Sequence, residues 1–210
     1  MPSRTQRLDA LFLEWRHQGG GPVTGFSCDG IIDEPAWETS RRKVLFLAKE
    51  PNEPCDDLRL LWRQHTWNTL DTWAYGLQNL ERFRIPGYAE ALTSQGSAFR
   101  SSAVVNLKKT PGGANANREL VREAVARDWT FIERELDIIN PDTVVCCGTF
   151  GFIRDWLFKA EPAIESNAYE DCYRRQNAVW INHCHPSARF PRKLMYYGLV
   201  GAYHGFLAKR

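Results

Sequence analysis

The chain has 210 residues, of which 43% are hydrophobic and 25% charged, so disordered, collagenous and coiled-coil proteins are excluded as its main class. The 27 basic and 25 acidic residues leave a formal net charge of +2, which by itself indicates no partner. The sequence contains no apolar run of about eighteen residues and no signal-peptide cleavage site near its charged start. We therefore expect a single domain over residues 1–210 that acts as a monomer and has no membrane partner.

The basic residues of the chain gather in two stretches that lack Asp and Glu, from Ala91 to Arg118 and from Cys172 to Arg210. If both stretches reach one face of the fold, that face is strongly basic and suits phosphate. The alternative is that these charges scatter over the surface, as charge runs often do. The two stretches hold Arg100, Lys108, Lys109, Arg118, Arg174, Arg175, Arg189, Arg192, Lys193, Lys209 and Arg210.

Six cysteines occur, and none of them forms a C-x-x-C pair. Cys146 and Cys147 stand in an apolar run, which is typical of small buried side chains. The spacing suits neither a zinc site nor an iron–sulfur cluster, and we expect no metal and no other cofactor. A disulfide framework is not expected in a chain of this size without a signal peptide, so the sequence indicates a reducing, cytoplasmic location.

Hydrophobic periodicity predicts helices that alternate with short strands. Continuous apolar runs such as KVLFLA are typical of strands buried on both faces, so the order of elements predicts an α/β fold with a four-stranded parallel sheet and helices on both faces. A helical insertion is expected at about residues 55–100. The predicted helices cover 4–17, 58–80, 117–139, 150–158 and 191–208, and the predicted strands cover 43–48, 102–107, 142–147 and 178–183. Between the glycines that end the first helix, Gly19 to Gly21, and Glu38, irregular chain is expected.

In a parallel sheet the ligand site lies beyond the carboxyl ends of the strands, so the loops that follow the predicted strands are the places to look for chemistry. The first loop carries Glu50, held by Pro51, which suits a general base or an electrostatic stabiliser. A helix cap or a surface salt bridge is the alternative for this carboxylate. The second strand ends in Asn106, whose amide can grip the edge of a pyrimidine in two bonds or simply cap a turn.

The last of these loops begins His183-Cys184-His185-Pro186, and alternation along the strand sends both histidines to the same side. A metal pair is one interpretation, but no third ligand has matching spacing. A catalytic histidine followed by a turn that grips DNA fits the basic surroundings better. After Asn106, the run Pro111-Gly112-Gly113 lets the backbone approach a ligand closely, yet it is not a Walker loop because no G-K-[ST] follows.

In their order and spacing these loops resemble the uracil-DNA glycosylase superfamily, over about Lys43 to Leu194. The resemblance is carried by VLFLAKEPN, VVNLKKTPGG, PDTVVCCG and HPSAR, each at the end of a predicted strand. VVNLKKTP with the later Asn117-Arg118 is similar to a pattern of the iron–sulfur branch, whose cysteine spacing is missing, so no cluster is carried over. The resemblance implies a three-layer α/β/α sandwich, DNA as the partner, and cleavage of the N-glycosidic bond of a base flipped out of the duplex.

The resemblance also implies roles for individual residues. Glu50 falls where the family often has a water-activating Asp, and Asn106 matches the Asn that reads the base. His185 matches the His that stabilises negative charge on the departing base. The expected contacts with DNA come from Lys108, Lys109, Ser187, Arg192 and the two wedge-loop residues Arg189 and Phe190.

Two positions near the base depart from the pattern or match it by spacing alone. Trp62 lies where the family places an aromatic that stacks on the base, with Trp67 and Trp73 as alternatives. Asn52 stands where strict uracil enzymes place a Tyr that excludes the thymine methyl group. Because Asn is smaller and polar, we expect uracil or a C5-modified pyrimidine as the substrate, hypermodified cytosine of phage DNA among them, and a role in DNA repair or phage defence.

The sequence thus predicts a monofunctional DNA glycosylase, a hydrolase that excises one base. A DNA-binding module of the same fold without catalysis is a second hypothesis, favoured by Glu50, which is one methylene longer than the usual Asp. A nucleotide or nucleoside hydrolase is a third, although a free nucleotide would have no use for the wedge and basic residues. Fold analogy alone does not decide among them.

Overall fold

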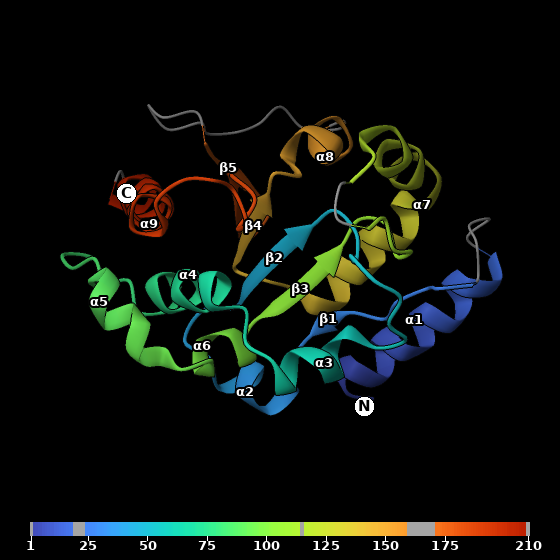
Figure 1. The fold of residues 1–210 in the computed structure, drawn as a ribbon, viewed down its shortest axis with the longest axis horizontal. Coiled ribbons are helices and arrows are strands. Elements are labelled where there is room, and N and C mark those ends of the chain that lie inside the picture. Colours follow the sequence, from blue (N-terminus) through green and yellow to red (C-terminus); the bar gives the residue numbers. More distant parts are fainter. Residues whose placement is uncertain (1, 19–23, 114–115, 159–170, 209–210) are drawn as a thin grey trace.

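The structure is a computed structural model of the chain, and it describes residues 2–18, 24–113, 116–158 and 171–208. Helices surround one central sheet (Figure 1). In chain order the helices are α1 (Arg4–Gln18), α2 (Glu34–Thr39), α3 (Leu58–Gln64), α4 (Asn68–Gln78), α5 (Tyr88–Ala91), a short 3₁₀ helix η1 (Leu92–Ser94), α6 (Ser97–Arg100), α7 (Arg118–Ile139), α8 (Phe150–Leu157) and α9 (Arg192–Ala208). The strands are β1 (Gly30–Ile31), β2 (Val44–Ala48), β3 (Ala103–Asn106), β4 (Thr143–Cys147), β5 (Cys172–Arg175) and β6 (Ala178–His183).

The sheet has six strands in the order β1-β3-β2-β4-β6-β5 and is mixed. The four predicted strands are present and run parallel to one another as β3-β2-β4-β6. An antiparallel strand adds to each edge, β1 beside β3 and β5 beside β6. The α/β class is therefore confirmed, whereas a sheet made of four parallel strands alone is not what the chain forms.

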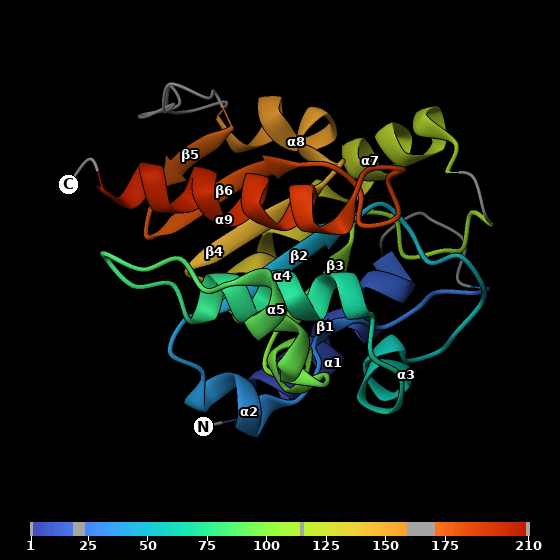
Figure 2. The same ribbon diagram turned by 60° about the vertical axis from the view of Figure 1, so that its left-hand side comes forward.

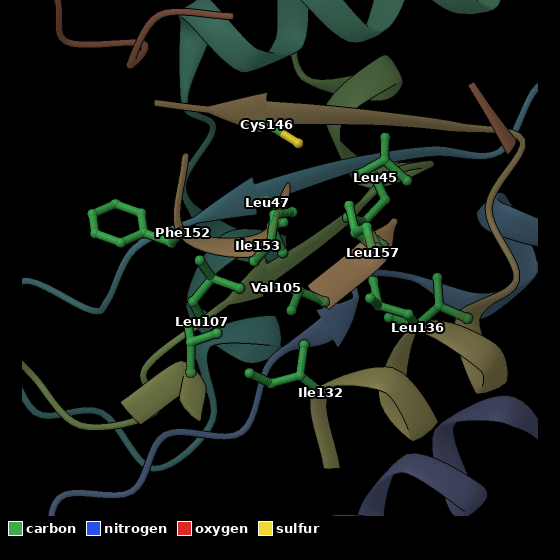
Figure 3. Close-up of a cluster of buried hydrophobic side chains, with 14 of the residues drawn as sticks. Leu45, Leu47, Val105, Leu107, Ile132, Leu136, Cys146, Phe152, Ile153 and Leu157 are labelled. Atoms are coloured by element: carbon green, nitrogen blue, oxygen red, sulfur yellow. The ribbon is translucent and has the colours of Figure 1, made fainter. Parts of the chain in front are cut away.

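Helices cover both faces of the sheet, and each face has its own apolar core. One core packs beneath α1, α7 and α8, and part of it is drawn in Figure 3. The other core lies beneath α4 and α9, which stand in front of the strands in Figure 2. We call this second side the α4/α9 face. Figure 3 shows Leu45 and Leu47 of β2, Val105 of β3 and Cys146 of β4 together with Ile132 and Leu136 of α7 and Ile153 and Leu157 of α8.

The helix predicted over 58–80 is two helices, α3 and α4, separated by an extended turn. The chain is extended at His65 and Trp67, where the aromatic and β-branched residues of His65-Thr66-Trp67 have lower helix propensity than the leucines before them. Gly96, in the left-handed region at φ 91°, packs against Thr66. The predicted insertion at about 55–100 is the helical segment that joins β2 to β3.

The segment predicted as irregular before residue 38 contains β1 and α2, which the sequence analysis missed. Asp33 caps α2 by accepting a hydrogen bond of 3.2 Å from the backbone N–H of Ala36, and Pro35 stands in the first turn. By contrast, the long amphipathic helix was predicted correctly as α7. It begins after Asn117, whose side chain caps it, and ends at Asn140 with φ 49°.

Candidate functional site

The carboxyl ends of the four parallel strands meet at one edge of the sheet. The register pairs Ala48 of β2 with Asn106 of β3, and Cys147 of β4 with His183 of β6. The loops that follow these strands therefore leave from the same edge, as expected for a parallel sheet. We call this edge, with its four loops, the loop edge.

The loops after β2 and β3 are hydrogen-bonded to each other beyond the end of the sheet. The backbone N–H of Lys108 donates to the carbonyl of Lys49 at 2.9 Å, and that of Gly112 donates to Pro51 at 3.0 Å. Gly113 donates to the carbonyl of Asn52 at 3.1 Å. Two segments that the sequence treats separately thus form one surface, which fixes Glu50 between them.

The carboxylate of Glu50 is buried at this junction, with its side chain 3% exposed. One oxygen, Oε2, accepts a hydrogen bond from the ammonium of Lys108, which also donates to the carbonyls of Thr110 at 2.9 Å and Pro111 at 3.2 Å. The other oxygen, Oε1, is buried without a hydrogen-bond partner among the described residues. Such an oxygen costs about 1–3 kcal/mol unless something bonds to it. Glu50 is therefore a held carboxylate with one acceptor to spare.

Gly112 lies directly against this carboxylate. A Cβ at this position would stand 1.9 Å from Oε1 and 2.2 Å from Oε2 of Glu50, so any side chain here would displace the carboxylate. The sequence predicted that the Pro-Gly-Gly run lets the backbone come close to a ligand. In the structure the close approach is to Glu50 itself.

The amide of Asn106 is also buried, and it contacts a residue that the sequence analysis did not single out. Asp29, which precedes β1 and is fully buried, accepts from the backbone N–H of Asn106 at 2.8 Å and from its side-chain Nδ2 at 3.1 Å. Asn106 alternates with Val104, a member of the core beneath the α4/α9 face, so its side chain belongs to that face.

The prediction that Lys109 contacts DNA phosphate does not agree with the structure. The side chain of Lys109 is only 2% exposed. Its ammonium donates to Asp29 Oδ1 at 2.5 Å and to Glu135 Oε2 at 2.7 Å. The ring of Trp15 lies 5.1 Å from the same ammonium. Burial acts to lower the pKa of Lys109, but the two carboxylates outweigh it and raise the pKa. Lys109 holds the core together instead of reaching DNA. Lys108, bonded to Glu50, is likewise engaged within the protein.

His185 lies at the start of the loop after β6, beside the loops after β2 and β4. An ideal Cβ on Gly148 would stand 3.8 Å from Cβ of His185 and 3.9 Å from Cε of Lys49, which brings these residues around one point. Burial, assisted by the Lys49 charge, lowers the pKa of His185. The backbone N–H of Ser187 donates to its Nδ1 at 3.2 Å, so a neutral ring carries its proton on Nε2. His185 is thus arranged as a hydrogen-bond donor through Nε2.

The two histidines of this strand end do not act as a pair. His183 turns under α9 and meets the ring of Trp73 at 4.8 Å between centroids. Burial lowers its pKa to about 4, which keeps it neutral. Among the described residues no group of three His, Cys, Asp or Glu side chains could hold a metal ion. The six cysteines are free thiols.

The three tryptophans considered for base stacking have different surroundings. Trp67, at the start of α4, lies 6.1 Å from His185 between ring centroids. Trp62 of α3 packs on Phe99 at 6.4 Å, and Trp73 is fully buried. Trp62 and Trp67 both border the core beneath the α4/α9 face at partly buried positions. Of the three, Trp67 is the one that the structure brings next to His185.

The loop that leads into α9 presents the expected wedge residues. Ser187 and Arg189 are exposed, and Phe190 has 61% of its surface exposed. A tight turn supports them, in which the backbone N–H of Ala188 donates to the carbonyl of His185 at 2.8 Å. Arg192, in the first turn of α9, is exposed as well. The side chain of Asn52 is exposed on the loop after β2.

The two acid-free stretches do not form one basic face. Arg100 precedes β3 at the opposite edge of the sheet and pairs with Asp33 at 2.8 Å, and Arg175 at the same opposite edge pairs with Glu133 at 3.1 Å. The sequence could not reveal this division because it depends on which end of a strand each residue occupies. Besides Lys108, which is paired with Glu50, the basic side chains near the loop edge are those of Lys49, Arg118, Arg189, Arg192 and Lys193.

The structure adds three residues to the site that were not assigned a role from the sequence: Asp29, Lys49 and Gly148. Lys49 stands within the AKEPN motif, and its ammonium forms no ion pair or hydrogen bond with any described residue. Gly148 has φ 68°, in the left-handed region, and its N–H donates to the carbonyl of His183 at 2.7 Å. The signal for Gly148 was present as a glycine directly after a buried strand.

Comparison with known proteins adds no assignment: no family model matches the chain, and no curated protein matches its sequence at a significant level. Within the described residues, no helix is long and apolar enough to cross a membrane.

Proposed function

We propose that this protein is a DNA glycosylase that flips a pyrimidine out of DNA and hydrolyses its N-glycosidic bond, as the resemblance to the uracil-DNA glycosylase superfamily implies. One observation carries the proposal. Glu50, a held carboxylate with a spare oxygen, follows β2, and His185, a neutral histidine with its Nε2 proton available, follows β6. The two strands are separated by β4, and both residues lie at the loop edge. We expect the protein to work as a cytoplasmic monomer without a cofactor.

The two groups suit the two charges that develop in the reaction. Positive charge grows on the sugar as the bond breaks, and the anionic Glu50 stabilises it while Oε1 orients the attacking water. Negative charge grows on the base, and His185 donates a hydrogen bond to it through Nε2. Lys49, which stands next to His185, adds a positive charge on the side of the departing base. The neutral state of His185 suffices because Lys49 supplies the cation.

The remaining residues bind the substrate. Asn106 reads the pyrimidine edge and Trp67 stacks on the flipped base, a role predicted for Trp62 by spacing with Trp67 as an alternative. The exposed Phe190 enters the gap left in the duplex, with Arg189, Ser187 and Arg192 on the phosphates. The exposed Asn52 leaves the C5 side of the base unblocked, which favours uracil or a C5-modified pyrimidine.

A non-catalytic DNA-binding module is the second candidate, and a specific observation favours it. The carboxylate of Glu50 is neutralised by Lys108 and covered by Gly112, so water reaches it only if the Gly112 loop shifts. In that case the wedge and basic residues would still bind DNA, and no base would leave.

The two candidates are separated by measuring excision with Glu50→Gln and His185→Ala. Duplexes with one uracil, cytosine or C5-modified cytosine are incubated with each variant, and abasic sites are revealed by hot alkali. We expect each substitution to slow excision by about 10²- to 10⁴-fold, which is the usual contribution of acid–base and charge-stabilising groups to a reaction rate. The affinity for the duplex should not change. Ser3→Ala, far from the loop edge, serves as the control. Equal cleavage by all three variants would refute the roles of Glu50 and His185, and no cleavage by the wild type would favour the binding module.

A further inference from the structure

Asp29 is a buried carboxylate that the proposed mechanism does not use. It is fully buried beside the outer edge of β3, between that strand and the helices α1 and α7. Both of its oxygens are engaged: Oδ2 accepts two hydrogen bonds from Asn106, and Oδ1 accepts one from Lys109. Burying a carboxylate is costly, and three donors in good geometry are what makes it tolerable here.

The contact with Asp29 settles which way the Asn106 amide faces. Both oxygens of Asp29 accept hydrogen bonds from other donors, Oδ1 from Lys109 and Oδ2 from the backbone N–H of Asn106, so the side-chain group that faces Oδ2 is the donor Nδ2 of Asn106 and not its Oδ1. If the amide turned over, two acceptor oxygens would face each other and the hydrogen bond between the side chains would be lost. The amide therefore keeps one N–H and its carbonyl oxygen, in a fixed order, for a ligand at the loop edge.

The other contacts of Asp29 show that its oxygens act as acceptors. The ammonium of Lys109 donates to Asp29 Oδ1 at 2.5 Å and to Glu135 Oε2 at 2.7 Å. The backbone N–H of Asn106 donates to Asp29 Oδ2 at 2.8 Å. Each oxygen of Asp29 therefore already accepts one hydrogen bond, apart from the bond with the Asn106 side chain.

We propose that Asp29 is a positioning residue that locks the Asn106 amide in one orientation and thereby sets which pyrimidine edge the site accepts. The inference rests on the proposed function. Uracil presents an acceptor at O4 and a donor at N3, whereas cytosine presents a donor at N4 and an acceptor at N3. A locked amide matches one of these edges in a given base position and opposes the other. An amide free to turn matches both.

The test is the substitution Asp29→Asn, with Glu135→Gln as a matched control. Asn has the shape of Asp but can donate as well as accept, so with Asn at position 29 the Asn106 amide can adopt either orientation. Lys109 keeps Glu135 as its partner. We measure kcat/KM on duplexes with a uracil-type and with a cytosine-type base, C5-modified bases included. In Asp29→Asn we expect the ratio of kcat/KM for the preferred base to kcat/KM for the other base to fall about 10- to 100-fold. This factor corresponds to the discrimination that one bidentate base contact provides. Glu135→Gln leaves Asp29 and Asn106 intact and should keep the wild-type ratio.

A second measurement needs no catalysis. In the wild type the side-chain NH₂ of Asn106 should give a single pair of NMR signals, with one proton slow to exchange with solvent because Asp29 holds it. In Asp29→Asn that protection should be lost. An unchanged base ratio in active Asp29→Asn, or fast exchange of both protons in the wild type, would overturn the inference. If the wild type releases no base, the proposed function fails, and the protected proton alone then supports or overturns the positioning role of Asp29.

Discussion

Lys108 and Lys109 are neighbours in the chain, yet their ammonium groups lie in two different regions of the molecule. Lys108 bonds to Glu50 at the loop edge, where the surrounding backbone carbonyls come from a loop. Lys109 enters the core between α1, α7 and β1, where it bonds to Asp29 and Glu135 and its partners are fully buried. At the loop edge one cation pairs with one carboxylate, whereas in the core one cation pairs with two. Among the described residues, Glu50 Oε1 and Glu135 Oε1 are both buried without a hydrogen-bond partner.

This difference indicates that the two pairs have different tasks. The Lys109 cluster fixes the strand β1 and the helix α7 against the end of β3, so its main contribution is to the fold. The Lys108 pair fixes a carboxylate next to solvent-facing loops, so its main contribution is to a site. The three predictions that follow test this division, beginning with the largest effect.

Substitution of Lys109 by Met should give the largest loss of stability. It leaves Asp29 and Glu135 buried without a cation, and breaking such a pair costs about 3–5 kcal/mol. Urea denaturation measures the free energy of unfolding. The exposed Lys193, replaced by Met as a control, should change it by no more than about 0.5 kcal/mol. A loss below about 1 kcal/mol for Lys109→Met would show that the core cluster does not hold the fold.

Substitution of Gly112 by Ala should have a smaller effect on stability and a specific effect on the site. The new Cβ overlaps the carboxylate of Glu50, so this carboxylate must leave its present position beside Lys108, at a cost of about 1–3 kcal/mol. Base release should fall because Glu50 moves with its loop. Gly151→Ala is the matched control, since nothing lies within 4 Å of that position. If Gly112→Ala releases base at the wild-type rate, the close packing on Glu50 is not part of the site.

The smallest effect concerns the pH dependence of the core cluster. The pKa of Glu135 is raised by burial, so the folded protein binds this proton more tightly than the unfolded chain, whose ordinary value is 4.5. The free energy of unfolding of the wild type, relative to Glu135→Gln, should therefore decrease as pH rises above about 4.5, by up to about 1.4 kcal/mol per pH unit, until the folded pKa is passed. A constant difference between the two proteins from pH 4 to pH 8 would refute the raised pKa.

Much of the fold could be predicted from the pattern of hydrophobic residues in the sequence. The four apolar strands and the helices α1, α7, α8 and α9 were predicted within one or two residues, because each buries a continuous or periodic apolar surface. The strands β1 and β5 were missed. β1 has only two residues, and β5 reads Cys-Tyr-Arg-Arg, which lacks both an apolar run and a regular alternation. Such edge strands form because a partner strand is already in place.

The candidate site was predicted less completely than the fold. Glu50, Asn106 and His185 could be singled out because each lies at or just after the carboxyl end of a buried strand, and their roles stay predictions. The roles of Lys108 and Lys109 could not be predicted, since their partners Glu50, Asp29 and Glu135 come from other parts of the chain. Charge alone suggested phosphate for both lysines. Only the tertiary structure shows that both cations are occupied within the protein.

The most direct test of the central claim is to identify what the wild-type protein releases from DNA. Duplexes that contain uracil, cytosine or C5-modified pyrimidines are incubated with the protein, and the free bases in solution are identified by mass spectrometry. We predict one released pyrimidine base, with the DNA strands intact until alkali is added, and its loss in Glu50→Gln. Duplex binding without release of any base from any of these DNAs would contradict the claim.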